Sequence, residues 1–279
     1  MMSDITFELF LCPVCGGELS REGQSCRCPA GHCFDIARGG YLHLLPANRM
    51  NSHEPGDDKE MVEARSRFLA KGYYAPLREA LISLSLKYAP DGVRLLDLGC
   101  GEGYYTCGVA NALQAAGKKP KAAGIDISKS AVRLAARQSK TTEFAVASVF
   151  HLPVADASMN LLMNCFSPLC IEEVQRTLTS GGHFIYVVPA AYHLWGLKSA
   201  IYDTPYPNEQ KETPYEGFRY SEIFRLESDI HLTSKEDIQC LFRMTPYFWK
   251  TSKADAAKLS ALEVLDTKIA FDLHIYEKL

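Results

Sequence analysis

The sequence of 279 residues has no excess of basic residues, because 30 Lys and Arg stand against 33 Asp and Glu and leave a formal net charge of −3. The whole molecule therefore presents no positive field that would attract nucleic acid. A nucleic-acid partner would require positive charge concentrated around one cleft, with the excess acid elsewhere. The chain also lacks the composition of a disordered protein, since 47% of its residues are hydrophobic and 23% are charged.

An export signal and a membrane span are missing as well. Residues 1–11 carry Asp4 and Glu8, have no Lys or Arg before their apolar stretch, and lack a small-residue cleavage site. The most apolar later window, 183–202, contains Pro189 and Lys198, so it predicts a buried strand followed by a helix. We therefore expect a cytoplasmic protein without a membrane partner. Its ten cysteines would stay reduced and serve as metal ligands, core residues or catalytic groups.

The N-terminal segment contains cysteines with the spacing of metal ligands. A C-P-x-C motif begins at residue 12, and a C-P-x-x-H motif begins at residue 28. Two such knuckles supply the four ligands of a tetrahedral structural zinc site, and a segment of about 40 residues has too little core to fold without such a site. The predicted ligands are Cys12, Cys15, Cys28 and His32, with Cys26 and Cys33 as alternatives in the second knuckle.

A change of composition after this segment predicts two domains. Residues 1–46 form the expected zinc ribbon, and residues 47–58, rich in Asn, Pro, Gly and Asp, have the composition of a linker. The second domain is expected to span 59–279. It opens with helical periodicity from Lys59 to Leu69 and again from Leu77 to Tyr88.

The run from Arg94 to Thr106 predicts a buried strand, a glycine-rich turn and the start of a helix. The strand ends near Asp97, and glycines follow at 99, 101 and 103. Glycines allow a sharp turn and close approach of the backbone to a ligand. The spacing is G-x-G-x-G rather than the G-x-G-x-x-G of pyrophosphate binding, which argues against an NAD-binding fold. A second strand, 122–126, ends in Asp126, where a carboxylate can accept hydrogen bonds from ribose hydroxyls.

This D-x-G-x-G-x-G pattern with a later acid resembles the class I S-adenosylmethionine-dependent methyltransferases. The resemblance implies an α/β, Rossmann-like domain in which Ser148, after the third strand, borders the adenine. Residues 161–164 would form the fourth strand, and Gly181 and Gly182 would form a turn into the fifth strand.

With the ribbon included, the whole chain resembles the RlmA family of 23S rRNA guanine-N1 methyltransferases. The similarity covers both knuckles, Ala64-Arg65 through Tyr74, the glycine-rich loop, Ser167-Pro168, His193-Leu194 and Met244 to Trp249. It implies structural zinc and S-adenosylmethionine as cofactors, 23S rRNA as partner, and a homodimer. The donor contacts expected from the resemblance and the residues above are Tyr74, Asp97, Gly99, Gly101, Glu102, Asp126, Ser148 and His193.

The implied reaction is methyl transfer to N1 of a guanine in an rRNA hairpin loop. Such a base must be unpaired or splayed out, because N1 lies on its pairing edge. A nearby group must accept the N1 proton. We expect this chemistry near Asn164, Phe166, Ser167 and Pro168, with Phe166 as a stacking partner. The alternatives are a small-molecule methyltransferase, which would not require the ribbon, and an inactive zinc-ribbon regulator, against which the intact glycines and Asp126 argue.

Several basic residues flank the linker or follow the fifth strand, and these are the better candidates for phosphate contacts, with a structural salt bridge as the alternative for each of them. They are Arg49, Arg65, Arg67, Lys71, Lys198 and Arg219. The cations after the first cofactor helix and on the second are expected to be solvated faces without a partner. They are Lys118, Lys119, Lys121, Arg133, Arg137 and Lys140.

Overall fold

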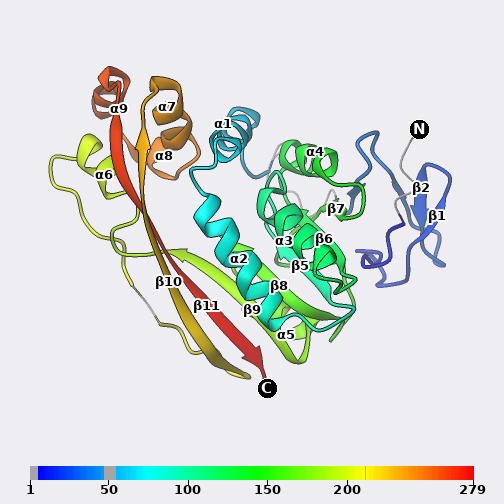
Figure 1. The fold of residues 1–279 in the computed structure, drawn as a ribbon. Helices are drawn as coiled ribbons and strands as arrows, with labels where there is room; N and C mark the ends of the chain where they lie inside the picture. The colour runs from blue at the N-terminus through cyan, green and yellow to red at the C-terminus, as the bar shows by residue number, and fades with distance from the viewer. Residues whose placement is uncertain (1–5, 47–54, 211) are drawn as a thin grey trace.

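A computed structural model of the chain describes residues 6–46, 55–210 and 212–279 (Figure 1). Its N-terminal part contains a small antiparallel sheet in the order β1-β2-β3. The three strands are β1 (Ser20–Glu22), β2 (Ser25–Arg27) and β3 (Cys33–Asp35). These strands are short and glycine turns separate them, as expected for a ribbon with little core of its own.

An eight-stranded mixed sheet in the order β10-β11-β9-β8-β5-β6-β7-β4 forms the centre of the described molecule. Strands β4 through β9 are parallel where they pair with one another, and β11 pairs antiparallel with both β9 and β10. The structure thus has the predicted α/β, Rossmann-like architecture. The strands are β4 (Leu42–His43), β5 (Arg94–Leu98), β6 (Lys121–Asp126), β7 (Glu143–Val146), β8 (Met159–Cys165), β9 (Leu178–Pro189), β10 (Phe218–Leu232) and β11 (Leu265–Lys278).

Helices cover both faces of this sheet. Figure 1 shows α2, α3 and α4 on the face toward the viewer, with α1 above α2 and α5 near the lower end of β9. Helices α6 to α9 gather around one end of the long β10–β11 hairpin. The helices are α1 (Lys59–Ala70), α2 (Ala75–Tyr88), α3 (Tyr104–Ala115), α4 (Lys129–Gln138), α5 (Ile171–Thr177), α6 (Trp195–Ile201), α7 (Lys235–Arg243), α8 (Tyr247–Lys250) and α9 (Lys253–Ala261). None of the described helices is long and apolar enough to cross a membrane.

The N-terminal segment is joined directly to the large sheet. Strand β4 pairs with β7 through Leu42 and Ala145, and the Leu44 amide donates to the carbonyl of Val146 at 2.8 Å. The Leu9 amide donates to the buried Glu143 carboxylate at 3.1 Å. Most of the proposed linker, 47–54, together with Arg49, lies outside the described residues. The part of the chain assigned to the ribbon therefore also completes one edge of the central sheet.

The two glycines expected to form a turn before the fifth strand lie inside β9 instead. Met159 of β8 pairs with Leu178, and Leu161 already pairs with His183, so β9 has extra residues between two pairing positions. Gly181 has φ +73°, which suits a glycine at such a bulge. The prediction of a separate turn was wrong, because the glycines permit a bulge that keeps the strand continuous.

Candidate cofactor site and metal centre

The two cysteine motifs bring four metal-binding side chains together. The ligand atoms of Cys12, Cys15, Cys28 and His32 all lie within 4.8 Å of one another. The Cys28 Sγ lies 3.3 Å from Nδ1 of His32 and 3.6 Å from the Cys15 Sγ. Zinc bonds of about 2.0–2.3 Å in a tetrahedron require ligand atoms at about this separation, so the donor set fits zinc. Neither Cys26, which is fully buried in β2, nor Cys33, which is exposed, belongs to this cluster.

Backbone turns hold both knuckles in place. The Gly16 amide donates to the carbonyl of Cys12 at 2.8 Å, and the Gly31 amide donates to that of Cys28 at 2.9 Å. Gly31 has φ +87°, a conformation that glycine adopts without strain. The C-P-x-C and C-P-x-x-H spacings thus produce two tight turns that face each other.

The second site lies where the strand order reverses between β5 and β8, the usual ligand crevice of such a sheet. The chain turns after β5 at Gly99, which has φ +81°. A side-chain carbon on Gly99 would lie 2.3 Å from Cβ of Ser167, which follows β8. The Ser167 hydroxyl donates to the carbonyl of Leu98 at 2.6 Å. The glycine-rich loop and the loop after β8 are therefore in direct contact.

Asp97, at the end of β5, is fully buried below the glycine-rich loop. Its Oδ2 accepts a hydrogen bond from the Thr106 hydroxyl at 2.5 Å, and its Oδ1 has no partner among the described residues. Burial is the main cause that raises the pKa of Asp97 to about 7; the nearby carboxylates of Asp126 and Glu102 also raise it, and the hydrogen bond from Thr106 opposes them. A buried, unpaired carboxylate oxygen is a suitable partner for a cationic donor group of a ligand.

Asp126, at the end of β6, connects two loops of the crevice. Its Oδ2 accepts from the Gly101 amide at 2.9 Å, and its Oδ1 accepts from the Ser128 amide at 2.8 Å. Ionised carboxylates accept more than two hydrogen bonds, so both oxygens retain capacity for ribose hydroxyls. Ser148 lies half-buried after β7, and its hydroxyl accepts from the Phe150 amide at 3.2 Å.

Glu102 is buried rather than solvated, and its partner is Arg65 of α1. The Arg65 Nε donates to Glu102 at 2.8 Å, and its Nη1 donates to Asp57 at 2.5 Å. Burial opposes the charge of Arg65, but the two carboxylates hold its pKa above the ordinary value. The guanidinium lies against Gly101, whose added Cβ would be 3.2 Å from it. No sequence pattern predicted this arrangement, although Ala64-Arg65 is part of the family resemblance.

Tyr74 and His193 meet on the other side of the crevice. Oη of Tyr74 lies 3.4 Å from Nε2 of His193, and Nδ1 of His193 accepts from the Ala270 amide at 3.2 Å. Burial, together with the charge of Lys198, lowers the pKa of His193 to about 3. The ring is therefore neutral, and the bond from Ala270 requires its proton to be on Nε2. His193 is a hydrogen-bond donor in this crevice and not a base.

The segment expected to carry the chemistry forms a loop held by its own polar groups. The Asn164 amide donates to the carbonyl of Pro168 at 3.1 Å and accepts from the Ser167 amide at 3.2 Å. Phe166 has φ +64° and is 45% exposed. Its ring lies 5.3 Å from that of Phe271, which also contacts Tyr74 and His193. Phe166 thus belongs to the crevice wall and not to the core.

Two of the expected phosphate contacts are wrong. Arg65 is held in the ion pairs above, and the amine of the fully buried Lys198 donates to the carbonyl of Tyr206 and to Asn208. The other described candidates are exposed but engaged in ion pairs. These pairs are Arg67 with Glu236, Lys71 with Asp237 and Arg219 with Glu277.

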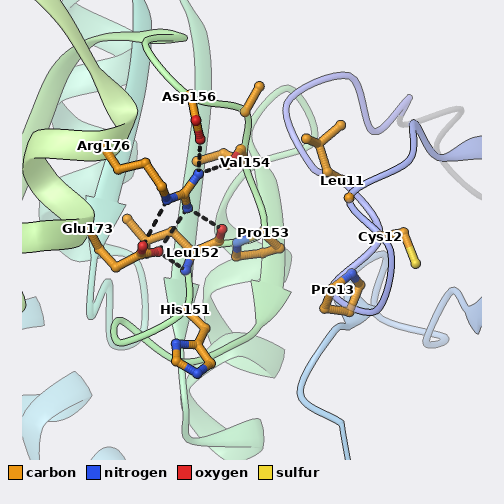
Figure 2. Close-up of a pocket in the computed structure, with 12 residues that line it drawn as sticks. Leu11, Cys12, Pro13, His151, Leu152, Pro153, Val154, Asp156, Glu173 and Arg176 are labelled. Carbon is orange, nitrogen blue, oxygen red and sulfur yellow. Dashed lines mark hydrogen bonds and ion pairs between the residues drawn. The ribbon is translucent and has the colours of Figure 1, made fainter.

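A cavity of about 520 Å³ lies between the ribbon and the loop after β7 (Figure 2), and no residue of the glycine-rich loop lines it. Arg176 of α5 holds that loop through the carbonyls of Leu152 and Val154 and through Asp156. Across the cavity, the Leu11 amide donates to the carbonyl of Pro153 at 2.7 Å. The residue preceding zinc-ligand candidate Cys12 therefore bonds to the stretch that follows Ser148.

The fold and the crevice define an S-adenosylmethionine-dependent methyltransferase that carries a zinc ribbon. Comparison with known proteins agrees with this class. The RlmA N-terminal zinc-ribbon family matches residues 10–53, and a methyltransferase-domain family matches residues 90–228. Both predicted cofactors, S-adenosylmethionine and structural zinc, are consistent with these matches.

Full-length similarity then identifies the family. The chain is 30% identical over 285 residues to YxjB of Bacillus subtilis, named as a 23S rRNA (guanine-N1)-methyltransferase, and the match covers 99% of each chain. It is 35% identical over 193 residues to the 23S rRNA (guanine(748)-N1)-methyltransferase of Streptomyces fradiae, covering 68% of this chain and 66% of that one. A similarly named Micromonospora griseorubida protein is 37% identical over 204 residues, or 66% of each chain. The protein belongs to the RlmA family of 23S rRNA (guanine-N1) methyltransferases.

Proposed function

We propose that this protein transfers a methyl group from S-adenosylmethionine to N1 of a guanine in a hairpin loop of 23S rRNA. The observation that supports this most is the joint presence of the Cys3His cluster and the glycine-rich crevice in a chain whose whole length matches YxjB. A small-molecule methyltransferase would not require the ribbon. We further propose Cys12, Cys15, Cys28 and His32 as the zinc ligands, a cytoplasmic location, and a homodimer on the basis of the family resemblance.

Residues on two walls of the crevice would bind different groups of S-adenosylmethionine. On one wall, Asp97 and Asp126 provide negative charge, which suits the cationic S-adenosylmethionine, whereas the charge of Glu102 is paired with Arg65. On the other wall, the His193 Nε2–H faces the Tyr74 oxygen, which leaves the Tyr74 O–H as a donor for a carboxylate. S-adenosylmethionine, when bound, supplies an electrophilic methyl group on its sulfonium. The loop at Gly99 and Gly101 would let S-adenosylmethionine approach the protein backbone closely, and Ser148 would border its adenine.

The loop after β8 offers the acceptor guanine a surface for stacking and does not offer it a proton acceptor. Asn164 and Ser167 use their polar groups to hold the loop, whereas the exposed Phe166 ring is free to stack on a splayed guanine. As the methyl carbon bonds to N1, the N1–H proton leaves to an acceptor, and S-adenosylhomocysteine is the leaving product. Holding N1 in line with the methyl group accounts for much of the rate in such reactions, about 7–11 kcal/mol in favourable cases.

The proposed reaction is tested by incubating the protein with labelled S-adenosylmethionine and 23S rRNA from cells that lack the enzyme. We expect label in the RNA and a new reverse-transcription stop at one hairpin-loop guanine, because N1 methylation blocks base pairing. The stop also identifies which guanine is modified. RNA without label would overturn the proposal. Label without a stop would show that the methyl group is attached to an atom other than N1.

Donor binding should depend on pH through Asp97. Because the pKa of this carboxyl is about 7 before ligand binding, it is mostly protonated at pH 6 and mostly charged at pH 8. A cationic ligand favours the charged form, so S-adenosylmethionine affinity should rise about tenfold from pH 6 to pH 8. Calorimetric titration at several pH values measures this rise. An Asp97→Asn protein that retained the full rise would contradict the assignment.

A further inference from the structure

Helix α4 carries three exposed cations on one face. Lys129, Arg133 and Arg137 occupy positions i, i+4 and i+8, and we call them the α4 stripe. The helix contains no Asp or Glu. In the part of the chain that the structure describes, none of the three forms a salt bridge, in contrast to Arg67, Lys71 and Arg219. The stripe is thus an uncompensated positive surface on a protein of net charge −3.

Local energetics disfavour this placement of charge. Like charges four residues apart on a helix repel each other and destabilise it. Lys129 also stands in the first turn of α4, where a cation opposes the helix dipole, and the N-cap Ser128 makes no side-chain cap bond. Neighbouring helices have acids where the dipole favours them, such as Glu60 in α1. Charge kept against local preference is typical of a surface that binds a partner.

The opposite face of α4 is fixed to the cofactor crevice. The Gln138 amide donates to the carbonyl of Glu102 at 2.6 Å, and an added Cβ on Gly103 would lie 3.0 Å from Cβ of Ala135. The α4 stripe is therefore about one helix diameter, roughly 10 Å, from the glycine-rich loop. A partner seated on the stripe would lie beside the donor site.

The ribbon extends the same surface. The turn Ala37–Tyr41 packs on α4, since Tyr41 shares a buried cluster with Val132 and Ala136. The charge of Arg133 acts on Tyr41, and that of Lys129 acts on His43 of β4. Arg38, within this turn, is exposed and has no salt bridge among the described residues. Figure 1 shows α4 on the side of the sheet nearest the ribbon.

We infer that the α4 stripe, continued by Arg38, binds consecutive phosphates of the RNA strand next to the target loop. This inference rests on the proposed function and adds the surface that holds the RNA. Successive stripe cations are separated by about 6 Å along the helix axis, which is comparable with the spacing of phosphates along one strand. Arg133 and Arg137, expected from the sequence to lie on a solvated face, thus join Lys129 and Arg38 in a local positive surface on a protein of net negative charge.

The inference is tested with a Lys129→Gln/Arg133→Gln/Arg137→Gln protein. The control is Lys119→Gln/Lys250→Gln/Lys253→Gln, which removes three other exposed cations without salt bridges among the described residues. Affinity for a labelled RNA hairpin of arbitrary sequence is measured by fluorescence anisotropy at several KCl concentrations. The stripe variant should bind at least tenfold more weakly, with a salt slope smaller by about 2–3, because each phosphate contact contributes about 0.7–0.9. The control should stay within twofold of the parent protein.

Further measurements separate this inference from the proposed function. In the methylation assay, the stripe variant should show a raised KM for 23S rRNA with kcat within twofold, because phosphate contacts bind substrate and transition state alike. Its affinity for S-adenosylmethionine and its melting temperature should not fall. If the parent protein methylates 23S rRNA and the stripe variant matches the control in affinity and salt slope, the stripe inference is overturned while the reaction stands. If the parent protein methylates no RNA, the proposed function fails. The hairpin titration still shows whether the α4 stripe binds RNA.

Discussion

Replacing Cys28 with alanine is expected to remove zinc from the protein and to unfold the ribbon around it. Cys28 supplies a ligand atom 3.3 Å from that of His32 and 3.6 Å from that of Cys15, so its loss leaves three ligands and an open knuckle. Structural zinc contributes about 10–16 kcal/mol to isolated zinc-finger peptides. The ribbon has little core to compensate, and its melting transition should disappear or fall steeply.

Metal analysis of purified protein measures this effect directly. One zinc per chain should fall to almost none in Cys28→Ala. Cys33→Ala is the matched control, because Cys33 is exposed, belongs to the same ribbon and lies outside the ligand cluster. Full zinc retention in Cys28→Ala, or equal loss in both proteins, would refute the proposed ligand set.

The second large effect is expected from Gly99→Ala, which should abolish donor binding while the ribbon keeps its zinc. The new methyl group would lie 2.3 Å from Cβ and 2.5 Å from Oγ of Ser167, and φ at this position is +81°. The left-handed conformation costs about 1–2 kcal/mol, and the clash must move one of the two loops that form the crevice. Displacements of about 1 Å in such loops reduce activity by about a hundredfold.

Gly117→Ala is a control matched in backbone conformation. Gly117 has φ +76° and no atom within 4 Å of an added Cβ, so alanine there adds only the conformational cost. The added variant Ser167→Gly should partly restore S-adenosylmethionine binding to Gly99→Ala, because it removes the clashing atoms. Unchanged titration of S-adenosylmethionine into Gly99→Ala would show that the two loops do not depend on each other as described.

Sequence spacing was sufficient for the local features of both sites. The C-P-x-C and C-P-x-x-H motifs each form one turn, so the approach of Cys12, Cys15, Cys28 and His32 needs only two short segments to meet. In the same way, the strand, glycines and helix from 94 to 115 are continuous in the chain. Periodicity and turn chemistry act over such distances.

Features that depend on distant partners were not predictable. The burial of Arg65 follows from Asp57 and Glu102, which reach it only after α1 docks on the glycine-rich loop. Whether an exposed cation is neutralised is decided in the same way, as the pairs of Arg67 with Glu236 and Arg219 with Glu277 illustrate. Strand β4 is too short for a pattern, and its place in the sheet is set by β7.

The docking of β4 on β7 joins two segments that the ribosome makes at different times. Leu42 is synthesised long before its partner Ala145, so the ribbon can bind its metal while the edge of the sheet that it will cover does not yet exist. When β7 emerges from the ribosome, a ribbon that has already bound zinc can pair with it through β4. An unpaired β7 edge would otherwise invite pairing between nascent chains on one polysome. Zinc supply is therefore expected to influence the yield of correctly folded enzyme as well as its affinity for RNA.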